Sequence, residues 1–266
     1  MTRRAPIGSL GFARIVEGLS DRDRAIIGSV SSLRFVTAHQ IETLHFADHA
    51  TKYSAARSCR RVLERLTCYR VLDRLERRVG GVRAGSSSWI YRLGPVGERL
   101  TRNGRRRRGG EPSATFLHHT LAVAQVVADL TAAARQRRCE LDGVQVEPQC
   151  WRVVRSGPGG TESLKPDLAV VVGVGEVEYR WFVEVDLGTE HIPTIVRKCR
   201  LYDRYYHSGD EQHVHGVFPK VIWSVPDHQR VHRIREALAH QRALTAELFA
   251  VSTADRLIDV LIGAAP

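Results

Sequence analysis

Twelve consecutive residues without an aliphatic or aromatic side chain divide the chain into two parts. Residues 101–112 read Thr-Arg-Asn-Gly-Arg-Arg-Arg-Arg-Gly-Gly-Glu-Pro. A segment of this composition cannot join a hydrophobic core, so we expect a mobile linker over residues 101–113. Its arginines would follow a phosphate backbone without reading sequence, although a purely solubilising linker has the same composition. The candidate phosphate contacts are the four consecutive arginines Arg105, Arg106, Arg107 and Arg108.

Charge is distributed unevenly on the two sides of this segment. Residues 1–115 contain 23 Lys and Arg but 10 Asp and Glu, a net charge of +13, whereas residues 116–266 contain 17 and 19. Such a basic half indicates a polyanionic partner, and we favour double-stranded DNA. A membrane surface is disfavoured because no segment pairs a basic stripe with a broad face of large apolar residues. No apolar run reaches the roughly 18 residues of a spanning helix. The first residues also lack the apolar stretch of a secretion signal, so a cytoplasmic location is expected.

The basic part is expected to form a winged helix-turn-helix domain over residues 15–100. Ser20 and Thr37 are each followed three positions later by a residue that can complete a capping box, which predicts two helix starts. A third helix is predicted over residues 54–66, where apolar side chains from Ala56 to Leu66 recur at spacings of three and four. Residues 71–75 and 89–93 read as the two strands of a ribbon.

The third helix is the expected recognition helix, which would lie in the major groove of DNA. Its polar face and the ribbon loop supply the candidate DNA contacts. These are Lys52, Tyr53, Ser54, Arg57, Arg61 and Arg65 on the helix, and Arg83 on the wing. A solvated helix face without a ligand would carry the same arginines.

The part after the linker is expected to form an α/β domain over residues 114–262. A helix is predicted over residues 114–138, and it is followed by alternating strand and helix signals. Strands are predicted at residues 145–154, 166–172, 179–187, 221–225 and 248–251, and helices at residues 192–207 and 228–240. The glycine-rich turn at residues 155–161 lacks the pattern of a phosphate-binding loop, so the sequence does not support nucleotide binding.

Three carboxylates fall on neighbouring predicted strands of this domain. Asp167 begins one strand, and Glu184 and Asp186 lie two residues apart on the next, and therefore on one face. Buried carboxylates need a pairing partner or a cation, and a cluster of oxygen ligands suits Mg²⁺ or Mn²⁺. Such an ion would activate water and stabilise charge on a phosphate. Alternatively, Asp186 starts a turn at Leu187 and Gly188, and Glu184 pairs with an arginine.

Several of these motifs resemble the replication-relaxation family of actinobacterial plasmids and mobile elements. The similarity covers about residues 20–260. It rests on the stretch from Arg34 to Ile41, the stretch from Arg60 to Leu66, the stretch from Tyr91 to Leu100, the strand at Pro166 and Asp167, the stretch from Phe182 to Glu190, and the helix with Lys198 and Tyr202. The resemblance implies a role in plasmid replication, DNA relaxation or mobilisation.

The resemblance further implies a C-terminal PD-(D/E)XK nuclease-like domain. Asp167 and Glu184 match its two acidic positions, but Asp186 stands where that motif has its lysine. Lys198 or Arg197 on the following helix is the candidate replacement cation. Tyr202, Tyr205 and Tyr206 on the same helix either hold a single strand by stacking or pack against the sheet.

The sequence therefore predicts a DNA-binding protein with an N-terminal winged helix and a C-terminal nuclease-like domain. If it is catalytic, it is a metal-dependent nickase in which Asp167, Glu184 and Asp186 hold the ion and Lys198 is the catalytic cation. The alternatives are an inactive nuclease-fold accessory factor and a transcriptional regulator. Other plasmid replication or mobilisation proteins are expected as partners. The sequence does not decide between a monomer and a homodimer.

Overall fold

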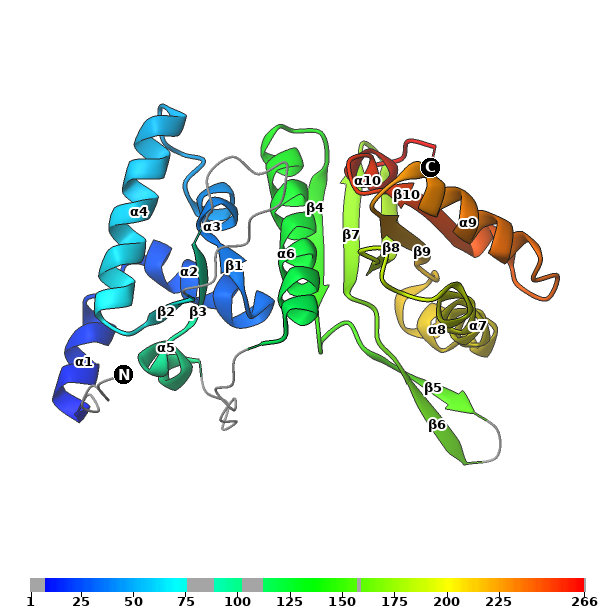
Figure 1. Cartoon of the computed structure of the whole chain (residues 1–266), viewed down its shortest axis with the longest axis horizontal. Helices are drawn as coiled ribbons and strands as arrows, with labels where there is room; N and C mark the ends of the chain where they lie inside the picture. The colour runs from blue at the N-terminus through cyan, green and yellow to red at the C-terminus, as the bar shows by residue number, and fades with distance from the viewer. Residues whose placement is uncertain (1–7, 76–88, 102–111, 157–158, 266) are drawn as a thin grey trace. The chain divides into compact units, whose positions relative to one another are not determined.

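The computed structural model describes residues 8–75, 89–101, 112–156 and 159–265 of the chain (Figure 1). It separates into two compact units, residues 1–128 and 129–266. Both units mix helices with strands, in agreement with the mixed fold class expected from the sequence. Within the described ranges, no helix combines the length and the apolar composition that crossing a bilayer requires.

The first unit builds its helices around a small antiparallel sheet of strand order β1-β3-β2. Its helices are α1 (Ser9–Glu17), α2 (Asp21–Leu33), α3 (Ala38–His45), α4 (Lys52–Cys68) and α5 (Pro95–Leu100), and its strands are β1 (Val36–Thr37), β2 (Leu72–Leu75) and β3 (Ile90–Leu93). Ile26, Ile41, Leu63, Leu66 and Ile90 are fully buried in this unit. Burial of their apolar surface is the main force that stabilises the unit.

Side-chain caps determine where three of these helices begin. Ser20 and Thr37 form the predicted capping boxes with Asp23 and Gln40, so both helix starts are confirmed. The prediction for α4 is wrong by two residues, because Thr51 also forms a capping box and the helix begins at Lys52. A capping hydroxyl satisfies a backbone N–H that the first helical turn leaves without a partner.

Helix α6 (Ala114–Arg135) contains the boundary between the two units, which falls after Ala128. Its first turns belong to the first unit, where Leu117 and Leu121 pack with Ile90 of β3. The buried Gln40 amide of α3 donates to the Leu121 carbonyl at 2.9 Å. The first unit therefore continues past the segment that the sequence predicts as a linker.

The second unit contains a five-stranded mixed sheet of order β10-β9-β8-β7-β4. These strands are β4 (Glu140–Val146), β7 (Leu168–Val174), β8 (Val177–Val185), β9 (Lys220–Val225) and β10 (Phe249–Thr253). Strands β8, β9 and β10 run parallel, whereas β4 and β7 are each antiparallel to their neighbours. Parallel strands need a crossover, and α7 (Ile192–Ser208) and α9 (His228–Ala239) supply the two crossovers between them.

Helices α7 and α9 pack on one face of this sheet. Tyr202 of α7 packs with Phe182 of β8 in one core cluster, and Ile234 of α9 packs with Trp223 of β9 in a second. The shorter elements α8 (Asp210–His215), a 3-10 turn (Ala246–Leu248) and α10 (Leu257–Leu261) complete the unit. Phe182 faces α7, and side chains alternate along a strand. Glu184, two residues after Phe182, therefore lies on the same face of the sheet.

The predicted strand at residues 145–154 is wrong. Strand β4 ends at Val146, a turn follows, and a separate two-stranded ribbon begins, formed by β5 (Arg152–Ser156) and β6 (Gly160–Leu164). Pro148 lies in the turn and lacks the backbone N–H that continued pairing requires. Arg155 and Ser156 of the predicted turn therefore belong to β5, and Gly160 and Thr161 to β6, in a ribbon that extends away from the five-stranded sheet in Figure 1.

Candidate active site and nucleic-acid surface

Asp167 and Glu184 lie opposite each other at the ends of two adjacent strands. Leu168 of β7 pairs with Val183 of β8, and the Asp167 N–H donates to the Val183 carbonyl at 3.2 Å. The register therefore places Asp167 directly across from Glu184. One carboxylate oxygen of Asp167 accepts from the Val185 N–H at 2.7 Å, which fixes the side chain. Both carboxylates are buried, at 8% and 1% exposure.

Helix α7 presents a lysine and a tyrosine to the two oxygens of Glu184. Lys198 Nζ lies 2.5 Å from Glu184 Oε2, and the Tyr202 hydroxyl donates to Glu184 Oε1 at 2.5 Å. Residues four positions apart in a helix point in the same direction, so a single helix face holds the carboxylate. The Lys198 side chain is 26% exposed, whereas that of Glu184 is 2% exposed. The lysine therefore forms the solvent-facing side of this pair.

Burial and the neighbouring charges shift the pKa values of this group. The pKa of Glu184 is raised to about 8, mainly by burial and to a lesser degree by the negative charge of Asp167, against the opposing effect of Lys198. Burial alone would lower the pKa of Lys198, but Glu184 and Asp167 raise it overall, so the ammonium stays charged. Burial also raises the pKa of Tyr202, which stays a hydrogen-bond donor. An added cation at this site would favour the ionised form of Glu184.

Asp186 is buried next to these residues in the sequence, but it has different partners. Its Oδ1 accepts from the N–H groups of Gly188 and Glu190, at 2.9 and 3.3 Å, and its Oδ2 lies 2.7 Å from the Arg230 guanidinium of α9. Gly188 has a φ of 84°, a value that a residue with a Cβ adopts only with strain. Asp186 thus holds the turn after β8 and joins it to α9.

The structure therefore brings together two of the three predicted carboxylates and Lys198. Among the residues that the structure describes, no group of three or more His, Cys, Asp and Glu side chains is placed to hold a metal ion. The alternative that Asp186 starts a turn is confirmed, and the partner of Glu184 is a lysine rather than an arginine. Sequence reasoning missed Arg230, and no local pattern marks it.

The chemistry of the remaining donors is compatible with Mg²⁺ or Mn²⁺. Proteins commonly bind Mg²⁺ through one or two carboxylates, with water and substrate phosphates as the other ligands. Asp167 and Glu184 supply two such carboxylates. These two residues are therefore the ones that would hold the ion.

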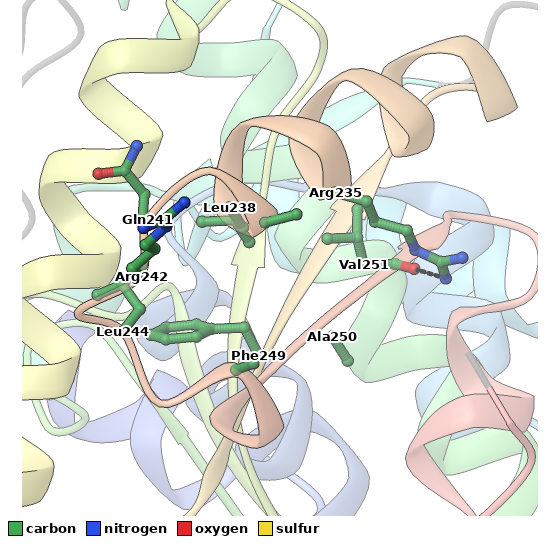
Figure 2. Close-up of a pocket in the computed structure, with 10 residues that line it drawn as sticks. Arg235, Leu238, Gln241, Arg242, Leu244, Phe249, Ala250 and Val251 are labelled. Atoms are coloured by element: carbon green, nitrogen blue, oxygen red, sulfur yellow. Dashed lines mark hydrogen bonds between the residues drawn. The ribbon is translucent and has the colours of Figure 1, made fainter.

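A separate pocket of about 490 Å³ lies between α9 and β10 (Figure 2). Leu238, Leu244 and Phe249 give it apolar walls, and Arg235 at its rim donates to the Val251 carbonyl at 2.8 Å. None of the candidate acids lines it. We therefore do not include this pocket in the site.

Helix α4 carries a group of exposed cations in the first unit. Lys52, Tyr53, Arg57 and Arg61 are exposed, and Arg60, which the sequence reasoning did not single out, joins them. Ser54 is half-buried, and its hydroxyl donates to the Thr51 carbonyl, so it takes part in the helix cap. The predicted contacts Arg83 and Arg105–Arg108 lie outside the described residues.

Arg65 differs from the other arginines of α4 because it has a buried partner. Its guanidinium lies 2.6 and 2.7 Å from the two oxygens of Asp23 on α2, a residue with 0% exposure. A buried carboxylate without such a partner would be strongly unfavourable. Arg65 thus attaches α4 to α2, although its side chain is still 42% exposed.

The chain thus combines a first unit that has a basic exposed helix with a second unit whose mixed sheet holds two acids beside a lysine. The model of the replication-relaxation family matches residues 27–221, and the chain belongs to that family. The match includes α4, Asp167, Glu184 and Lys198, whereas Arg230 lies beyond it. No curated protein and no solved structure matches the chain.

Proposed function

We propose that this protein binds double-stranded DNA through its first unit and cuts one strand with a divalent metal ion in its second. The observation that carries the proposal is the contact between Lys198 and Glu184 beside Asp167. It supplies the lysine that the strand motif lacks, because α7 brings Lys198 to the carboxylate from another position. Two acids and a lysine are the side chains that a PD-(D/E)XK nuclease requires.

The order of the elements supports this assignment. In the second unit, α6 precedes β4, β7 and β8, and α7 connects β8 to the parallel β9, which is the order expected for the nuclease fold. In the first unit, α2, β1, α3, α4, β2 and β3 follow in the order of a winged helix. Helix α4 takes the place of the recognition helix, which lies in the major groove of DNA.

Each residue of the site has a defined part in the proposed reaction. Asp167 and Glu184 would hold the ion, which supplies activation of water and neutralisation of phosphate charge. Lys198 places a positive charge where the phosphate gains negative charge in the transition state. Tyr202 fixes the orientation of Glu184. Water adds to phosphorus, one P–O bond breaks, and the departing strand end leaves as a hydroxyl after it takes up a proton.

Nicking of supercoiled plasmid in Mg²⁺ or Mn²⁺ tests the proposal. Glu184→Gln and Lys198→Ala should each reduce the nicking rate by at least about 100-fold, the usual effect of removing one stabilising group. Lys220→Ala is the matched control, because Lys220 is exposed at the far end of the adjacent strand β9. Duplex binding should persist in all three variants. A wild-type protein that binds DNA but leaves the plasmid intact in both metals would refute catalysis.

A second candidate function is that of a DNA-binding accessory factor with an inactive nuclease-like domain. The observation that favours it is the closed arrangement at Glu184, where Lys198 and Tyr202 occupy both oxygens. Isothermal titration with Mn²⁺ separates the two candidates. Binding that disappears in Glu184→Gln supports the nuclease, whereas no binding at millimolar Mn²⁺ supports the accessory factor.

A further inference from the structure

The two-stranded β5–β6 ribbon has one buried face and one exposed face. Val154 and Leu164 on the buried face pack with Leu201 and Tyr205 of α7. In the antiparallel register, Val153 lies opposite Ser163 and Arg155 opposite Thr161. Trp151 and Lys165 continue the same alternation at the base of the ribbon, where they contact each other. The exposed face therefore consists of Trp151, Val153, Arg155, Thr161, Ser163 and Lys165. We call it the outer ribbon face.

The chemistry of the outer ribbon face suits a nucleic-acid strand. Trp151 is 36% exposed and Val153 is 66% exposed, and Lys165 Nζ lies 4.5 Å from the centre of the Trp151 ring. Lys165 and Arg155 make the face doubly positive, and none of its six residues is acidic. The nearby Glu162 lies on the opposite face and pairs with Arg204. The face thus combines an aromatic ring with uncompensated cations, as strand-binding grooves do.

Buried ionic contacts hold the ribbon in place. Arg152 Nε donates to Glu211 Oε2 of α8 at 2.8 Å, and the Tyr205 hydroxyl of α7 donates to the same oxygen at 2.5 Å. Glu211 is 3% exposed, so this contact is shielded from solvent. The outer ribbon face is therefore supported from behind, and it binds without prior ordering of its backbone.

The base of the ribbon adjoins the candidate active site. Lys165 precedes Asp167 by two residues, and the Cys150 thiol at the other strand donates to the Pro166 carbonyl at 3.0 Å. The buried face of the ribbon also packs on α7, which carries Lys198. A strand that lies along the outer ribbon face would therefore approach the segment that carries Asp167.

We propose that the outer ribbon face binds an unpaired DNA strand and leads it to Asp167 and Glu184. Trp151 stacks on a base, and Arg155 and Lys165 contact phosphates. An unpaired strand is favoured over a duplex because only an unstacked base offers its flat face to an aromatic ring. Tyr202 and Tyr205 of α7 cannot take this part because they are buried, and Tyr206 packs against the same core cluster. The proposal rests on the proposed nuclease function, for which it names the form of the substrate.

Fluorescence anisotropy with a labelled twelve-nucleotide thymidine strand tests the proposal on the full chain. Trp151→Ala should bind about tenfold more weakly, whereas Trp151→Phe, which keeps an aromatic ring, should retain most of the affinity. Arg155→Ala should reduce the slope of log affinity against log salt by about 0.7, the value for one neutralised phosphate on a single strand. Arg233→Ala on α9 is the matched control, because it removes an exposed arginine of the same unit.

Tryptophan fluorescence gives a second, direct readout. Trp181 and Trp223 are buried, and Trp89 is half-buried in the first unit, so quenching by the strand should fall in Trp151→Phe. Unchanged affinity and salt slope in folded Trp151→Ala and Arg155→Ala would overturn the proposal. If the same variants weakened duplex binding equally, the ribbon would contact a groove of duplex DNA. That result would overturn the proposal of an unpaired strand. Strand binding is measured without metal and without cleavage. The binding test can therefore be interpreted even if the wild-type protein does not nick the plasmid.

Discussion

Single residues with the same chemistry have different tasks in this protein, and the arginines of α4 show it most clearly. Arg61 is exposed, whereas Arg65, one helical turn later, neutralises the buried Asp23. Sequence spacing places both on one polar face. It could not separate them because Asp23 lies 42 residues away in the chain and meets Arg65 only in the folded unit.

Alanine substitution of these two arginines should therefore have different consequences. Arg65→Ala leaves Asp23 without its partner and should lower the free energy of unfolding by about 1–3 kcal/mol. Arg61→Ala should change stability by less than about 0.5 kcal/mol, as is usual for exposed positions. Urea denaturation followed by circular dichroism measures both. Equal stability of the two variants would remove the structural task that we assign to Arg65.

The ionisation of Glu184 should make stability depend on pH. Its pKa is about 8 in the folded chain, against an ordinary value of 4.5, so between these values the folded state binds more protons than the unfolded state. The contribution of Glu184 to stability is therefore lost progressively as pH rises from about 4.5 to about 8. Glu184→Gln cannot titrate and should flatten this decline in urea denaturation at pH 5 and pH 8. Glu178→Gln, on the same strand but exposed, is the control, and a decline that persists in Glu184→Gln contradicts the assignment.

At the scale of elements, the turn between β8 and α7 is held by α9 through a buried ion pair. Asp186 and Arg230 are 44 residues apart in sequence, and both are almost fully buried. The Arg230 guanidinium also donates to the Glu190 carbonyl, at the far end of the same turn. The pair thus fixes the segment that leads from the strand with Glu184 to the helix with Lys198.

Arg230→Ala should destabilise the second unit by about 3–5 kcal/mol, because it leaves the Asp186 carboxylate buried without compensation. Arg233→Ala, an exposed arginine on the same helix, should leave stability within about 0.5 kcal/mol of the wild type. Thermal unfolding of both variants, monitored by circular dichroism, provides the comparison. Similar melting temperatures would show that the turn does not depend on this pair.

The elements themselves were largely predictable because apolar periodicity and capping residues are local signals. Ser20 and Thr37 begin helices as expected, and four of the five strands predicted for the α/β domain have counterparts at β7, β8, β9 and β10. The fifth prediction joined β4 to β5 because apolar residues occur on both sides of Pro148. The two carboxylates of the site were also predictable, since Asp167 and Glu184 stand at strand positions. Arg230 was not, because only the tertiary fold brings it to Asp186.

At the scale of the whole molecule, the charge difference follows the division into units. Residues 116–128 contain no Lys, Arg, Asp or Glu, so the net charge of +13 belongs entirely to the first unit. Salt dependence of duplex binding should therefore originate mainly there. Exposed arginines of α4 are the described residues best placed to contribute to it.

Arg57→Ala with Arg61→Ala should weaken duplex binding and reduce the slope of log affinity against log salt by about 0.9 for each phosphate that the variant no longer neutralises. Arg14→Ala with Arg24→Ala removes the same charge from exposed positions on α1 and α2 and is the matched control. Anisotropy titrations at several salt concentrations give both slopes. Equal weakening in the two double variants would mean that net charge, rather than α4, governs binding.

The first turns of α6 decide where the chain can be divided for separate study. A fragment that stops at residue 113 would keep every predicted DNA contact, but it would strip Leu117 and Leu121 from Ile90 and would leave the Gln40 amide without its acceptor. Its exposed apolar surface would favour aggregation over folding. A fragment for expression of the amino-terminal half alone should therefore end after Gln125, whose side-chain oxygen also accepts a hydrogen bond from the Gln40 amide.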